Sequence, residues 1–68
     1  MEVGKKIKEI RLLRGISQKE LSERLGVSSA MISQYESGKR NPKMETLLKI
    51  ADALGISINV FYENLSKD

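Results

Sequence analysis

The stretch SQKELSERLGVSSAMISQYESG, residues 17–38, decides the fold because it predicts two short helices joined by a tight turn. Ser17 can cap the first helix, expected over residues 18–25. Glu20 lies three residues later and can reach back to the Ser17 amide, which would complete a capping box. Gly26 ends this helix because glycine adopts the left-handed conformation at little cost.

The second helix of the pair, expected over residues 29–37 with Ser28 as its cap, has two unlike faces. Its bulky apolar residues fall on one side: Met31, Ile32 and Tyr35. Small residues and one amide occupy the other side: Ser29, Ala30, Ser33, Gln34 and Ser37. Such an uncharged, hydrogen-bonding face suits a helix that approaches base edges in a DNA groove. On composition alone, a serine-rich surface helix fits equally well.

Composition limits the classes of function. The chain has 68 residues and contains neither cysteine nor histidine, so we expect one small domain without a disulfide or thiolate metal site. The usual general base is missing and no carboxylate pair is placed for acid–base chemistry, so we expect no enzyme, metal or cofactor. Because we find no membrane-length apolar run and no signal peptide, the default expectation is a soluble cytoplasmic protein.

The charge is unevenly distributed along the chain. The net charge is +3, but residues 1–43 carry about +5 and residues 44–68 about −2. The segment between the expected helices over residues 29–37 and 44–54 adds Lys39, Arg40 and Lys43 beside the turn formers Asn41 and Pro42. This asymmetry favours a polyanion on one side of the fold, and the loop favours a phosphate contact over a merely solvated turn. Ser17 and Gln18 begin a helix, where a phosphate is also well placed.

Three further helices are expected, over residues 3–14, 44–54 and 58–64. In the first, Val3, Ile7 and Ile10 form an apolar stripe with Leu13 at its edge, and Leu12 points away. Arg11 lies beside the stripe, so its guanidinium needs a nearby acid, for which Glu36 is the natural partner.

In the other two helices, the sequence leaves open where the helix over 44–54 begins and what the outer side of the helix over 58–64 contacts. Met44, Leu47, Ile50, Ala51 and Leu54 line one side of the helix over 44–54. This helix begins either with Asn41 as cap and Pro42 as first residue or with Lys43, a poor cap. In the last helix, Phe61 and Leu65 turn inward and leave Ile58 and Val60 partly outside, which indicates either a homodimer contact or simple exposure.

The order of these residues resembles the phage-repressor-like (XRE, Cro/cI-type) helix-turn-helix family from about Val3 to Phe61. Matching positions include Arg11, Gln18, Leu21, Gly26, Ile32, Glu36, Gly38, Pro42, Ile50 and Ser57. The resemblance implies an all-α, compact five-helix bundle in which the helix over 29–37 enters the major groove. Lys43 departs from the family, which usually has a small capping residue there.

The family's residue roles carry over position by position. The resemblance assigns base contacts to Ser29, Ala30, Ser33 and Gln34, and to Gln18 a phosphate contact that sometimes extends to a base; we count Gln18 with the base-contacting residues. It assigns phosphate contacts to Ser37, Lys39 and Arg40, and we expect Ser17, Ser28 and Asn41 to join them. The Arg11–Glu36 pair is then structural. The last helix and the loop before the helix over 44–54 often form the dimer contact in the family, and we expect Ile58, Asn59 and Val60 to form it here.

These observations predict a sequence-specific regulator of transcription, a repressor that binds a palindromic double-stranded operator as a homodimer. Gln34 is the best base reader because its amide can pair with adenine. A protein-interaction module such as an antitoxin is the alternative, motivated by exposed Leu12, Ile58 and Val60. A restriction–modification controller would share the fold and is not separable by sequence.

Overall fold

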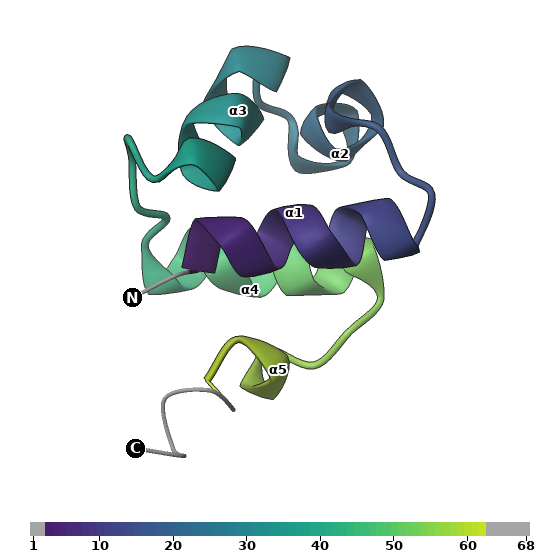
Figure 1. The fold of residues 1–68 in the computed structure, drawn as a ribbon, viewed down its shortest axis with the longest axis vertical. Helices are drawn as coiled ribbons and strands as arrows, with labels where there is room; N and C mark the ends of the chain where they lie inside the picture. Colours follow the sequence, from purple (N-terminus) through teal and green to yellow (C-terminus); the bar gives the residue numbers. More distant parts are fainter. Residues whose placement is uncertain (1–2, 63–68) are drawn as a thin grey trace.

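The computed structural model describes residues 3–62, which form five α-helices and contain no β-strand. The helices are α1 (Val3–Leu13), α2 (Gln18–Leu25), α3 (Ser29–Ser37), α4 (Met44–Leu54) and α5 (Asn59–Tyr62). α1 and α4 lie against each other, α2 and α3 pack together on one side of them, and α5 lies on the other side (Figure 1). The predicted all-α class and the two helices joined by a tight turn are confirmed.

Local sequence sets the ends of α2 and α3 as predicted. The Glu20 amide donates to Ser17 Oγ at 3.0 Å, and the Met31 amide donates to Ser28 Oγ at 3.1 Å. Gly26 and Gly38 end these helices with φ of 73° and 85°, the left-handed region that favours glycine. The capping serine and the terminal glycine of each helix therefore set where α2 and α3 begin and end.

The reciprocal half of the predicted capping box is not formed. The Glu20 carboxylate instead accepts a hydrogen bond from Arg24 Nη2 at 2.7 Å, one helical turn further along α2. An i,i+4 pair of opposite charges on a helix surface is favourable and competes for the carboxylate.

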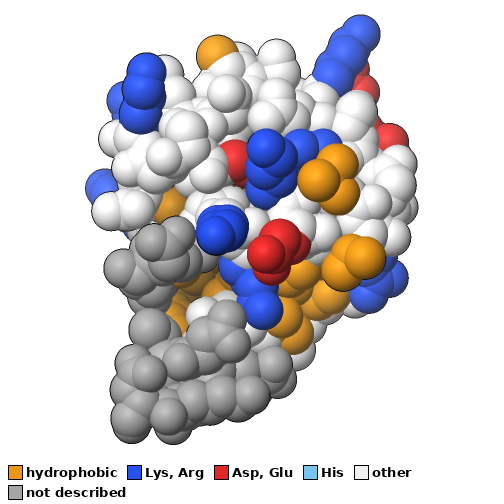
Figure 2. Space-filling model, in the orientation of Figure 1, with side chains coloured by type: hydrophobic (Ala, Val, Ile, Leu, Met, Phe, Trp, Pro, Cys, Tyr) orange, Lys and Arg blue, Asp and Glu red, His pale blue; other side chains and the backbone are white. Residues whose placement is uncertain are grey.

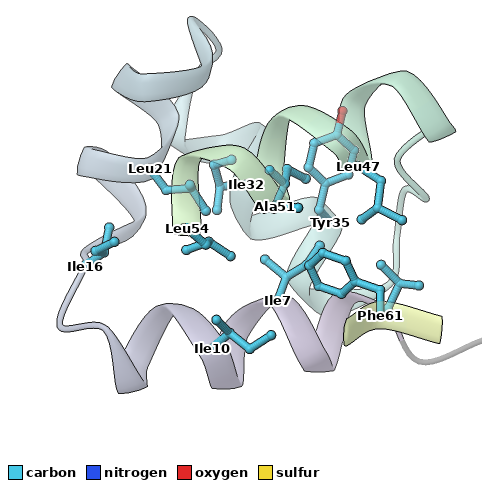
Figure 3. Packing of buried hydrophobic residues seen from close by; sticks show 12 residues of the cluster. Ile7, Ile10, Ile16, Leu21, Ile32, Tyr35, Leu47, Ala51, Leu54 and Phe61 are labelled. Carbon is cyan, nitrogen blue, oxygen red and sulfur yellow. The ribbon is translucent and has the colours of Figure 1, made fainter. Parts of the chain in front are cut away.

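All five helices contribute to one hydrophobic core (Figure 3). Its buried side chains are Val3, Ile7 and Ile10 from α1, Leu21 from α2, Ile32 and Tyr35 from α3, Leu47, Ile50, Ala51 and Leu54 from α4, Phe61 from α5, and Ile16 between α1 and α2. Because a chain this short has few core residues, each of them contributes a large share of the stability.

Two residues that were predicted to belong to the apolar stripes are exposed instead. Leu13 is 86% exposed and Met44 is 55% exposed. α1 ends at Leu13, and the turn through Gly15 brings Ile16 to the core instead. Met44 is the first residue of α4, and its Sδ accepts a hydrogen bond from the Tyr62 hydroxyl at 3.4 Å, so it lies over α5.

Helix boundaries differ slightly from those predicted. α1 ends one residue earlier than expected. α4 has Lys43 at its N-cap with no side-chain hydrogen bond, so the Asn41–Pro42 alternative is wrong. α5 begins at Asn59, one residue late, and the predicted residues 63–64 and Leu65 lie outside the described part. None of the described helices combines the length and apolar character that a membrane span needs.

α1 approaches the end of α3 closely at Gly4. A Cβ atom added to Gly4 would overlap the carbonyl oxygen of Tyr35 and lie 3.0 Å from that of Glu36. Both neighbours are backbone atoms, so only a shift of one helix could make room. Gly4 therefore helps to set the distance between α1 and the last turn of α3.

We predict that Gly4→Ala lowers the free energy of unfolding by about 1–3 kcal/mol through overpacking. Alanine is otherwise the better helix former, by about 1 kcal/mol, so the sign of the change is informative. Urea denaturation measures it, with Lys8→Ala, at an exposed position of α1, as the control. A Gly4→Ala variant as stable as the wild type would contradict the close approach.

Candidate nucleic-acid interface

α3 turns its bulky side toward the core and its small side toward solvent. Ile32 is 0% exposed and Tyr35 is 8% exposed. On the small face, Ser29, Ala30, Ser33 and Ser37 are exposed and Gln34 is half-buried. Met31, on the bulky side, is also half-buried. The predicted orientation of this helix is therefore confirmed. In the view of Figure 2, the surface over α2 and α3 is mostly neither charged nor hydrophobic, with Lys and Arg toward its edges.

A buried ion pair joins α3 to α1. Arg11 Nε donates to Glu36 Oε2 at 2.6 Å and Arg11 Nη2 donates to Glu36 Oε1 at 3.1 Å, so the pair is bidentate. Arg11 Nη1 also donates to the carbonyl oxygen of Ile16 at 2.8 Å. The pair predicted from the sequence is present, and its guanidinium has partners on α3 and in the α1–α2 turn.

Gln18 joins the same cluster, which the sequence did not predict. Its Nε2 donates to Glu36 Oε1 at 3.0 Å. We refer to Arg11, Gln18 and Glu36 together as the Glu36 cluster. Gln18 and Glu36 are 18 residues apart, so no local spacing could have indicated their contact.

The three hydroxyls predicted to contact phosphate are not equivalent. Ser17 Oγ and Ser28 Oγ accept bonds from backbone amides, which leaves each O–H able to donate to a phosphate oxygen. Ser37 Oγ instead donates to the Gln34 carbonyl at 3.2 Å and lies 3.4 Å from the Lys39 amide, which donates to it. The Ser37 hydroxyl hydrogen is therefore already used at the end of α3.

The loop after α3 is held against that helix by its backbone. The Arg40 amide donates to the carbonyl oxygen of Gln34 at 3.2 Å. Lys39, Arg40 and Asn41 are exposed, so two cations and an amide follow directly on the exposed face of α3. This places positive charge beside a hydrogen-bonding surface, the combination that positions a nucleic-acid backbone.

Two of the basic residues counted in the positive part of the chain are directed elsewhere. Arg24 Nη1 donates to the Ala53 carbonyl at 2.7 Å, and Arg14 Nη2 lies 3.5 Å from the Gly55 carbonyl. Both cations thus interact with the end of α4, where free carbonyls and the helix dipole favour positive charge. The charge asymmetry of the sequence overstated the charge that is available near α3.

The predicted dimer residues lie on α5 and just before it. Ile58 and Val60 are half-buried against the core, while Asn59 is exposed. α5 and α3 lie at opposite ends of the molecule in Figure 1. A contact through α5 would therefore leave the exposed face of α3 uncovered.

Residues 3–62 contain no group of three or more acidic, cysteine or histidine side chains able to hold a metal ion. Two open hollows lie beside the ends of α2 and α4, and Arg24, Lys49 and Asp52 line one of them. The exposed face of α3 with the following loop is therefore the candidate interface.

Comparisons with known proteins identify the family. A sequence model of the helix-turn-helix family matches residues 7–61. The HTH-type transcriptional regulator ImmR of Bacillus subtilis (strain 168) is 39% identical over 57 residues, which cover 84% of this chain and 45% of ImmR. The chain thus spans less than half the length of that curated relative.

Two solved structures match over most of both chains. The P22 c2 repressor, solved in complex with a synthetic operator, is 33% identical with a TM-score of 0.80 and covers 90% of this chain and 92% of its own. The restriction-modification controller protein C.AhdI from Aeromonas hydrophila is 30% identical with a TM-score of 0.83, covering 87% and 86%. The chain therefore belongs to the phage-repressor-like (XRE) helix-turn-helix family, a family of DNA-binding transcription regulators.

Proposed function

We propose that this chain is a transcriptional repressor that binds double-stranded DNA sequence-specifically, with α3 in the major groove. The observation that carries this proposal is the face of α3: Ser29, Ala30 and Ser33 are exposed while Ile32 anchors the helix. A small, uncharged face lets a helix approach base edges closely. The P22 c2 repressor, which resembles this chain over nearly its whole length, was solved bound to an operator.

Base recognition is assigned to the start of α2 and to α3. Gln34 is the principal reader because its amide can form two hydrogen bonds with adenine. Ala30 suits the methyl group of thymine. Ser29, Ser33 and Gln18 complete the base-contacting set.

Phosphate contacts surround this set. Ser17 and Ser28 can each donate a hydroxyl hydrogen beside a helix N-terminus. Lys39, Arg40 and Asn41 are exposed directly after α3. We assign Ser37 a lesser part, because its hydroxyl hydrogen is donated within the protein.

We further propose that two copies bind one palindromic operator, with half-sites about 34–36 Å apart. Ile58, Asn59 and Val60 would form the contact between copies, since Ile58 and Val60 are apolar and only half-buried. No residue of the base-contacting set would be covered by it. With DNA as its target, the protein would act in the cytoplasm.

Two related functions are favoured by particular observations. The similarity to C.AhdI, of which this chain covers 86%, favours a restriction-modification controller. Exposed Leu12, at 60%, favours a protein-interaction role such as that of an antitoxin. The first would still bind DNA at a symmetric site, whereas an interaction module with no DNA role would show no affinity for duplexes at low salt.

Selection of bound sequences from a pool of random duplexes tests the proposal. We expect a symmetric consensus whose half-site centres are separated by about one helical turn. A consensus without symmetry would contradict the dimer, and the absence of any enrichment would contradict sequence-specific binding.

We predict that Gln34→Ala relaxes the preference at one base position and costs about 1–3 kcal/mol of discrimination there. Titration of the selected duplex and of its single-position variants measures this. The exposed neighbour Ser33→Ala serves as a comparison on the same face of α3. An equal loss of affinity on every sequence would remove Gln34 from base recognition.

We predict that Arg40→Ala weakens binding to all duplexes. The plot of log affinity against log salt has a negative slope, and its magnitude should decrease by about 1 because one phosphate contact is lost. The control is Lys49→Ala on α4, which removes the same charge beside Asp52 of α4 and Arg24 of α2. It should leave the slope unchanged. If Arg40→Ala and Lys49→Ala gave the same slope as the wild type, Arg40 would not contact phosphate.

A further inference from the structure

The carboxylate of Glu36 is enclosed between three helices. Its side chain is 4% exposed and that of its partner Arg11 is 8% exposed. Both oxygens are occupied: Oε2 accepts from Arg11 Nε, and Oε1 accepts from Arg11 Nη2 and from Gln18 Nε2. A buried carboxylate with three donors is fixed in place, because moving it would leave the Arg11 charge without its partner.

This fixed acceptor determines which way the Gln18 amide faces. An ionised carboxylate can only accept hydrogen bonds, so it attracts the NH₂ group of Gln18 and repels its carbonyl oxygen. The bond of 3.0 Å from Nε2 to Glu36 therefore directs Gln18 Oε1 away from the carboxylate. The second hydrogen on Nε2 stays available.

We infer that Glu36 is a positioning residue for DNA recognition, which holds the amide of Gln18 in the orientation that a base or phosphate meets. The inference rests on the proposed function of this face. Gln18 contacts the DNA, and Glu36 acts through it without touching DNA itself. The ion pair predicted as purely structural thus has a second role at the start of α2.

The argument extends to the geometry of the pair of helices. Arg11 Nη1 donates to the carbonyl oxygen of Ile16, the residue that precedes the Ser17 cap of α2. The Glu36 cluster therefore connects α1, the first turn of α2 and the last turn of α3. Gln18 is held by the same carboxylate that anchors α3, so its amide and the reading face of α3 keep one relative position.

Gln34 provides a contrast within the same chain. It is also half-buried, but among residues 3–62 its side-chain amide forms none of the described hydrogen bonds. We therefore expect binding to order Gln34, whereas Gln18 is already held by a hydrogen bond to Glu36. Ordering one rotamer-rich side chain costs an amount that corresponds to about 2- to 12-fold in affinity.

A measurement on the free wild-type protein tests the positioning directly. We expect the ¹⁵N order parameter of the Gln18 side-chain amide to approach that of rigid backbone, about 0.85, and that of Gln34 to fall below about 0.6. Equal order parameters for the two amides would overturn the inference. This readout requires no DNA, so it reports whether Gln18 is held even if the proposed DNA binding fails.

A second experiment removes the positioning group and measures binding. Arg11→Met and Glu36→Met are introduced together, because replacing both members of a buried pair is often tolerated whereas removing one leaves an unpaired charge. The probe is the duplex selected by the wild type, and circular dichroism verifies the fold at the temperature of the titration. The paired substitution is made with Gln18 present and in a Gln18→Ala background.

We expect the paired substitution to weaken binding about 2- to 12-fold when Gln18 is present and less than about 2-fold in the Gln18→Ala background. A merely structural pair would cost the same factor in both backgrounds, because its effect would not pass through Gln18. Equal factors, including no change in either, would therefore overturn the inference. Wild-type protein that binds no duplex would instead contradict the proposed function, and the order parameters would still report on Gln18.

Discussion

The arrangement of this protein depends on the burial of one side of α3. Ile32 is completely buried and Tyr35 nearly so, on a helix that packs against α1 and α2. A helix of nine residues is not stable alone in water, so this packing is what makes α3 a helix and decides how it is rotated. The serines and alanine on the other side are exposed as a consequence. The reading face is therefore a product of the core.

The Glu36 cluster restricts how α3 can be rotated against its neighbours. Hydrophobic contacts would tolerate small rotations of α3, whereas the bidentate contact between Arg11 and Glu36 is geometrically specific. A buried ion pair is weak evidence for stability, since its desolvation cost offsets much of the attraction. Its value here lies in fixing which atoms face one another, and the contact to Gln18 extends that order to the surface.

The distribution of charge follows from where helices begin and end. Arg24 and Arg14 lie at the carbonyl end of α4, where cations are favoured. Lys39 and Arg40 follow α3 and stay exposed. A modest net charge can thus produce a local positive surface beside α3, because part of the remaining charge is compensated within the fold. The dimer contact proposed at α5 lies at the opposite end of the molecule from this surface (Figure 1).

The sequence by itself determined the positions of the helices to within a residue or two, the capping residues of α2 and α3 and the two faces of α3, since these depend on residues three or four positions apart. It also identified the Arg11–Glu36 pair, because a cation beside an apolar stripe requires a partner. Only the tertiary structure decided that Leu13 and Met44 are exposed and that Gln18 binds Glu36. The physical reason is that burial at a helix end and contacts between distant residues depend on which helix packs there, and no local periodicity contains that information.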